Sequence, residues 1–324
     1  MSKHRPNGFS ALFSGLKAAL QWRPLLWWAL ALGLPALLAT LPIWASLNAQ
    51  FAHSVHAPDI AAGRDLSLLL DGFVALYGDG ALAADFGTLA AIAVTLLLSP
   101  WLTGMVVATQ RAGKHLKLGE LAHGGLAEYW RMFRLLLWSL LPLGVAVGLG
   151  AAALSAADKL TAAAILKSEV ARAGNVALAV AALLFVFAHS TVEAARGWLG
   201  AEAGLRSIFR AWWRGLKLVL RRPLATLVVY IGSSAAGYLL AALFGWWRLR
   251  GDGAGIAAFL FGWLLTQCVV VALAWGRIAR LHGFNALAQG RIVEMAAQPA
   301  ETKPATQPGN DNSESETITP LASA

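Results

Sequence analysis

Long uninterrupted runs of apolar residues alternate with short polar segments along most of this chain. Six of these runs are close to the roughly twenty residues that an α-helix needs to cross a bilayer. They occupy residues 25–47, 86–108, 135–154, 175–195, 224–244 and 256–276. The pattern predicts an all-α polytopic membrane protein, with six transmembrane helices arranged as three hairpins. We therefore assign residues 1–295 to a six-span membrane domain.

The composition changes abruptly after this domain. Residues 296–324 are rich in Pro, Thr, Ser, Asn and acidic residues, and they show no apolar period. Such a segment cannot bury enough apolar surface to fold. We predict a disordered cytoplasmic tail.

A second pattern, amphipathic rather than apolar, precedes the fifth run. Between Ala203 and Pro223, apolar residues recur every three or four positions, and basic residues recur at nearly the same step on the opposite face. Such a helix is expected to lie flat at the membrane surface, with its charges among the headgroups. We therefore predict cytoplasmic amphipathic interfacial helices. Their charges either bind anionic lipid headgroups or only orient the spans, without a specific ligand. The candidate lipid-binding residues are Arg206, Arg210, Arg214, Lys217 and Arg221.

The entry into this fifth run also resembles the entry into the first. Gly-Leu-Lys leads to Arg-Pro-Leu at residues 15–25 and again at residues 215–224, with one residue of offset, and residues 128–136 look like a weaker copy. We interpret this as an internal repeat of a surface helix, a span out and a span back. Three such units would be related by an axis along the membrane normal. The alternative is that any junction of an amphipathic helix and a proline looks alike.

Composition and charge agree with a membrane protein. Hydrophobic residues make up 58% of the chain and charged residues only 13%, against about 25% charged residues in soluble domains. The net charge of +9 would suit a nucleic-acid partner, but the basic residues flank the apolar runs and no nucleic-acid module is visible. The N-terminal segment, the second and fourth loops and the C-terminal segment hold 20 of the 26 Lys and Arg residues. By the positive-inside rule, both termini are cytoplasmic.

Ionisable groups inside the predicted spans are rare, and one pair stands out. His189 and Glu193 are four residues apart and so share a helix face. With Gln267 of the sixth run they form our candidate intramembrane polar site. One interpretation is a proton-coupling or ligand-binding pair in a small transporter or channel. The other is a helix end near the headgroups, where Glu193 pairs with Arg196 or reaches the interface.

Two spacings of small residues would let helices approach closely. Gly144 and Gly148 form one, and Ser233 and Gly237 form the other. We expect both to serve packing within the bundle rather than dimerisation.

No catalytic or cofactor-binding motif is visible. The chain has no P-loop, Rossmann fingerprint, G-x-S-x-G or zincin signature. An intramembrane enzyme with His189 as base would need a second catalytic group, and none is apparent. The lone Cys268 supports neither a disulfide nor a zinc site. We therefore expect no enzymatic activity, cofactor or metal.

The region from residue 189 to residue 230 carries a family resemblance. A Glu193-x-x-Arg196 pair is followed by a helix beginning near Arg206, and then by Gly-Leu-Lys-x-x-Leu-x-Arg-Pro-Leu at residues 215–224. These motifs resemble a broad group of uncharacterised six-span bacterial inner-membrane proteins. The layout is similar to the membrane domain of some glycerophosphodiester phosphodiesterases, over roughly residues 9–287. The soluble catalytic domain of those enzymes has no counterpart here, so the resemblance implies an inner-membrane location and no phosphodiesterase activity.

These observations lead to one main functional prediction. We expect an integral protein of the bacterial inner membrane that acts through lipid contact or as the membrane partner of another protein. A homo-oligomer is compatible with this role, and nucleic acid is not an expected partner. The small transporter or channel is the alternative.

Overall fold

The computed structural model describes residues 7–51, 53–56, 67, 70, 81–164, 166–250 and 256–297. The described residues form helices and no strand. The helices are α1 (Gly8–Ala18), α2 (Trp22–Phe51), α5 (Ala81–Ala112), α6 (Leu118–Leu160), α7 (Lys167–Ala201), α8 (Ile208–Arg221), α9 (Pro223–Leu249) and α10 (Ile256–Ala297). Beyond residue 297 the predicted tail lies outside the described residues.

Six of these helices are long and apolar enough to cross a membrane. They are α2, α5, α6, α7, α9 and α10. The prediction of an all-helical chain with six such helices is confirmed, and it is compatible with an integral membrane protein. Consecutive long helices pack together, α2 against α5, α6 against α7 and α9 against α10.

Two of the long helices extend well beyond a single span. α6 has 43 residues and α10 has 42, whereas about twenty suffice to cross a bilayer. In α6 the weaker copy of the repeat, residues 128–136, continues without a break into the apolar run. In α10 the helix continues past residue 276, where the apolar run ends. These extensions place polar side chains on the same rigid rods as the apolar segments.

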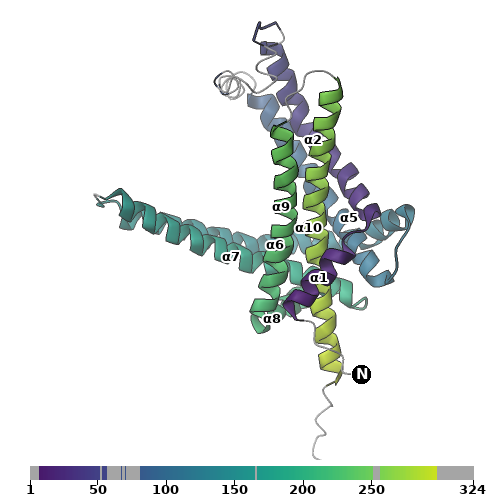
Figure 1. Ribbon diagram of the computed structural model, residues 1–324. Coiled ribbons are helices and arrows are strands. Elements are labelled where there is room, and N and C mark those ends of the chain that lie inside the picture. Colours follow the sequence, from purple (N-terminus) through teal and green to yellow (C-terminus); the bar gives the residue numbers. More distant parts are fainter. Residues whose placement is uncertain are drawn as a thin grey trace, which may run out of the picture.

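The helices α6 and α7 project steeply away from the upright helices α9 and α10 (Figure 1). Along this projecting part most apolar side chains are exposed, including Leu140 of α6 and Leu183 of α7. An apolar surface of this extent is typical of a membrane environment rather than of water.

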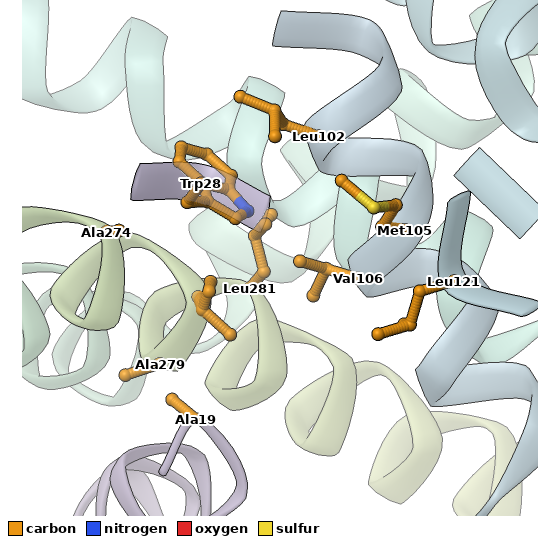
Figure 2. Close-up of a cluster of buried hydrophobic side chains, with 10 residues drawn as sticks. Ala19, Trp28, Leu102, Met105, Val106, Leu121, Ala274, Ala279 and Leu281 are labelled. Carbon is orange, nitrogen blue, oxygen red and sulfur yellow. The ribbon is translucent and has the colours of Figure 1, made fainter. Parts of the chain in front are cut away.

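The packed core lies where the ends of the long helices meet the short helices α1 and α8. Figure 2 shows one of its clusters, in which Trp28 of α2 lies against side chains of α5 and α10. A second cluster joins α5, α6, α7 and α8 around Trp198. A third joins α1, α8, α9 and α10 around Phe284. The clusters of buried side chains thus lie mainly at one end of the long helices.

Glycine allows three helix crossings of the same kind in this core. A Cβ atom at Gly15 of α1 would lie 2.5 Å from a backbone carbonyl oxygen of α10. A Cβ atom at Gly125, near the start of α6, would lie 2.7 Å from a side-chain carbon of α5. A Cβ atom at Gly215 of α8 would lie 2.7 Å from the backbone of α7. The contacts at Gly15 and Gly215 are with backbone and exclude any larger residue, whereas at Gly125 side chains of α5 would have to shift.

The two spacings of small residues differ in what they do. Gly237 of α9 faces Gly276 of α10, and a Cβ atom at Gly237 would lie 3.0 Å from the Gly276 Cα atom. Packing at this second spacing is therefore confirmed. At Gly144 and Gly148 of α6 a Cβ atom would meet nothing within 4 Å. The prediction that these two glycines pack inside the bundle was wrong, because they face open space on the part of α6 that projects, together with α7, away from α9 and α10 (Figure 1).

Candidate functional site

The basic helix α8 is fixed at its start and along one face. The Ser207 hydroxyl accepts a hydrogen bond from the Arg210 backbone N–H at 3.3 Å, as an N-cap does. Ala211, Gly215 and Leu218 are buried. With this face covered, the positions of the remaining side chains of α8 follow from helix geometry.

An aromatic patch lies on another side of α8. Phe209 and Trp213 are exposed, while Trp212 is half-buried. The Trp138 ring of α6 lies 5.6 Å from the Phe209 ring and 5.8 Å from the Trp212 ring. The Trp212 indole N–H donates a hydrogen bond to the Thr191 hydroxyl of α7 at 3.2 Å. This patch has the amphipathic aromatic character of side chains at a membrane interface.

A pocket of about 400 Å³ lies between α7, α8 and α10, and we call it the basic pocket. Its apolar lining consists of Trp198, Leu218 and Met295. Its cationic lining consists of Arg214, Lys217, Arg221, Arg222 and Arg291. Cations from α8, from the junction before α9 and from the end of α10 therefore converge on one space.

The basic pocket divides the five predicted lipid-binding residues. Arg214, Lys217 and Arg221 line it. Arg206 and Arg210 are exposed and do not line it. Two further cations, at residues 222 and 291, were missed by the sequence analysis. The clustering of basic residues up to Pro223 hinted at the first, whereas the second comes from a helix far along the chain.

Two carboxylates partly neutralise the basic pocket. Arg214 forms an ion pair with Glu202. Glu294 forms ion pairs with both Arg222 and Arg291, the latter at 2.7 Å. These pairs orient three of the five guanidinium or ammonium groups, and they leave the pocket with an excess of positive charge.

The remaining two cations of the pocket are Lys217 and Arg221. Neither forms an ion pair with any residue that the structure describes, and both are exposed. The Lys217 ammonium lies 5.4 Å from the centre of the Trp213 ring. These two groups are therefore free to meet an anion that enters from outside.

A second group of ionisable side chains is centred on Glu193 of α7, which is 0% exposed. We call it the Glu193 cluster. The Glu193 Oε1 atom lies 2.5 Å from Arg196, 3.5 Å from His189 and 3.7 Å from Arg280 of α10. On its other side the His189 Nδ1 atom lies 2.7 Å from the Tyr230 hydroxyl of α9. The cluster thus joins three of the long helices through polar contacts.

Two arginines of α10 extend this cluster. Arg280 donates a hydrogen bond to the Ser234 hydroxyl of α9 at 2.9 Å. Arg277 donates one to the Ser99 hydroxyl of α5 at 3.2 Å, and its guanidinium lies 5.3 Å from the centre of the Trp28 ring. With Arg196, three guanidinium groups gather around a single carboxylate among the described residues. A buried charge that lacks a counter-charge is costly, so this imbalance needs an explanation.

The structure brings two of the three candidate intramembrane residues together and separates the third from them. His189 and Glu193 are in contact, as their spacing suggested, and Glu193 is also paired with Arg196. Gln267 lies ten residues before Arg277 on α10, which corresponds to about 15 Å along the helix axis. Gln267 therefore does not belong to the Glu193 cluster.

The described residues contain no group of three or more His, Cys, Asp or Glu side chains that could hold a metal ion. No model of a known protein family matches the chain, and no curated protein sequence or solved structure is significantly similar to it. Proposals on function therefore depend on the geometry of these two sites.

Proposed function

We propose that this chain is a multi-pass protein of the bacterial inner membrane that binds anionic lipid headgroups in its basic pocket and acts without catalysis. The observation that carries the proposal is the convergence of five cationic side chains on a space of about 400 Å³. Arginine is well suited to phosphate because its planar fork donates two parallel hydrogen bonds. The apolar lining from Trp198, Leu218 and Met295 suits the part of a lipid that lies next to its headgroup.

The charge of the pocket supplies a sufficient driving force. Each Lys or Arg close to an anionic leaflet contributes about 1 kcal/mol of attraction. After the pairs with Glu202 and Glu294, an excess of three positive charges remains. The corresponding attraction of about 3 kcal/mol would make the affinity for an anionic headgroup roughly a hundredfold higher than that for a neutral one.

The proposal includes a layout in the membrane. In it the long helices form three hairpins, α1 and α8 lie at the cytoplasmic interface, and both termini are cytoplasmic. The glycine crossings support an internal repeat of three units, namely α1 to α5, α6 with α7, and α8 to α10. Helix α1 packs on α10, the last helix of the third unit. The start of α6 packs on α5, the last helix of the first unit, and α8 packs on α7, the last helix of the second. This is the cyclic order that a threefold axis along the membrane normal would generate.

One pair of helices needs reorientation in this layout. In Figure 1 the helices α6 and α7 are steeply inclined to α9 and α10. All six helices can cross a single bilayer only if this pair swings toward the others. The exposed apolar surface of the pair favours such a position, because lipid covers it there.

A small transporter or channel is the second candidate function. It is favoured by the continuous polar contact from Tyr230 through His189 to Glu193. It requires a pH-dependent flux that Glu193→Gln abolishes. We favour lipid binding because Glu193 is already engaged by Arg196 and Arg280 and so has the contacts of a structural ion pair.

Native mass spectrometry of the purified full-length protein tests the lipid proposal. The test variant is Lys217→Gln with Arg221→Gln, and the matched control is Arg206→Gln with Arg210→Gln. Each double variant removes two exposed positive charges. All four residues belong to α8 except Arg206, which lies just before it. Only the first pair lines the basic pocket. The same spectra report whether the protein is a homo-oligomer or retains a protein partner at fixed stoichiometry.

We expect the test variant to lose retained phosphatidylglycerol or cardiolipin, and the control to keep it. An equal loss in both variants would mean that the charges attract anionic lipid without a defined pocket. Unchanged retention in both would remove lipid binding by α8 altogether. Either of these two results contradicts the proposal.

A further inference from the structure

A second cavity, of about 240 Å³, lies beside α10 near the end of its apolar run, where α2 and α9 both pack against that helix. Its polar lining includes Ser234, Arg277 and Arg280. Leu273 and Tyr238 also line it, and both are exposed at the surface of the helices. The cavity far exceeds the roughly 10–15 Å³ that one water molecule needs in the same measure. It shares no lining residue with the basic pocket.

Three hydrogen-bond donors on residues that line this cavity lack an acceptor among the described residues. They are the indole N–H of Trp28 and the Nε–H groups of Arg277 and Arg280, each of which is buried and without a partner among the described residues. Trp28 is only 3% exposed. Most buried polar groups in proteins are paired, and an unpaired one is costly. Since all three groups are donors, the missing partner is an acceptor.

The charges around the cavity also favour an acceptor, and specifically an anionic one. Arg277 and Arg280 line the cavity, and the nearest carboxylate is that of Glu193, which lies 3.7 Å from Arg280 and closer still to Arg196. The other contacts of Arg277 are the neutral Ser99 hydroxyl and the Trp28 ring. Two half-buried guanidinium groups therefore share part of one negative charge. A ligand that supplies both acceptors and negative charge would satisfy the site.

We propose that this cavity binds a phosphate-type oxyanion, held by Arg277 and Arg280 with the Trp28 indole N–H. The guanidinium groups match the geometry of such an oxyanion. Leu273 and Tyr238 leave an apolar border, which suits an oxyanion carried on an acyl or alkyl chain. A free phosphate has the same headgroup chemistry, and the experiment below separates the two sources. The proposal is independent of lipid binding in the basic pocket.

Isothermal titration calorimetry on the full chain in a neutral maltoside detergent tests this site. The parent protein carries Lys217→Gln and Arg221→Gln, so that the basic pocket is weakened. The probes are dodecyl phosphate and inorganic phosphate. The neutral detergent itself is the reference for an alkyl chain without an oxyanion.

Three variants address different parts of the site. Trp28→Phe removes one donor and keeps an aromatic ring beside Arg277. Arg280→Gln removes one guanidinium. Leu273→Trp fills the border of the cavity and leaves the Glu193 cluster intact, so it remains informative if Arg280→Gln does not fold. Its matched control is Leu264→Trp, at an exposed position of α10 that does not line the cavity.

We expect the parent and the Leu264→Trp control to bind dodecyl phosphate alike. Each of the three site variants should bind it about tenfold more weakly or worse, the loss expected for one charge-assisted hydrogen bond or for a blocked entrance. Binding of dodecyl phosphate alone assigns a chain-borne oxyanion, and binding of both probes assigns a free one. The proposal is overturned if neither probe binds the parent protein. It is equally overturned if Trp28→Phe and Leu273→Trp bind as the parent does.

Discussion

The Nη2 atom of Arg280 on α10 lies 3.7 Å from the Oε1 atom of Glu193 on α7. The same oxygen accepts a hydrogen bond from Arg196 at 2.5 Å. The fully buried carboxylate is therefore the negative centre between two helices that are distant in sequence. Its loss would leave neighbouring buried guanidinium groups without their counter-charge.

The first prediction concerns this carboxylate. Glu193→Gln should lower the free energy of unfolding by about 3–5 kcal/mol, the usual effect of removing one partner of a buried ion pair. Thermal or denaturant unfolding in detergent micelles measures it. The matched control is Glu169→Gln, at an exposed position near the start of the same helix, which should change stability by less than about 1 kcal/mol. Equal effects of the two substitutions would mean that Glu193 has no special structural role.

The sequence could predict part of this cluster. Glu193 and Arg196 are three residues apart on one helix, so their contact follows from helix geometry alone. Arg277 and Arg280 looked like cytoplasmic residues that follow the last apolar run. Their half-buried positions depend on the continuation of α10 past residue 276 and on its packing against α7. Such packing between distant segments leaves no mark in the local pattern.

The fold shows the same division between local and distant information. The six long apolar helices were predictable because each apolar run exceeds or approaches the length of a span. Which spacing of small residues packs against another helix was not predictable. Gly237 packs against Gly276, whereas Gly144 and Gly148 face open space. A spacing of small residues allows two helices to approach closely. Whether they do depends on whether another helix lies beside that face.

The second prediction concerns the crossing of α8 and α7. Gly215→Ala should lower the free energy of unfolding by about 1–3 kcal/mol, because the new methyl group would overlap the backbone of α7. The same measurement on Gly204→Ala serves as control, since a Cβ atom there would meet nothing within 4 Å. Gly15→Ala, which also meets the backbone of a neighbouring helix, should be destabilising to a similar degree. A neutral Gly215→Ala would show that this close approach does not hold the helices together.

The third prediction concerns the orientation of α6 and α7. In a Cys268→Ser background, Ala162→Cys in the segment between these helices should react with a membrane-impermeant maleimide added outside the inner membrane. Ala203→Cys, just before α8, should react only after the inner membrane is permeabilised. Both alanines are exposed, so access to the reagent depends on the side of the membrane. If Ala162→Cys reacts only after permeabilisation, the pair does not cross the bilayer, and the proposed arrangement of three hairpins fails.

The last prediction uses the carboxylate that competes with anions in the basic pocket. Glu294 pairs with both Arg222 and Arg291. Glu294→Gln should free these two cations for a ligand and raise the affinity for phosphatidylglycerol by roughly two- to fivefold, corresponding to about 0.5–1 kcal/mol. Titration of short-chain phosphatidylglycerol into the detergent-solubilised protein measures the change. Glu120→Gln, at an exposed position in the first turn of α6, removes the same charge away from the pocket and should leave the affinity unchanged. A gain of equal size in both variants would reflect net charge alone, whereas a loss of affinity in Glu294→Gln would mean that this carboxylate is needed to hold the arginines in place for binding.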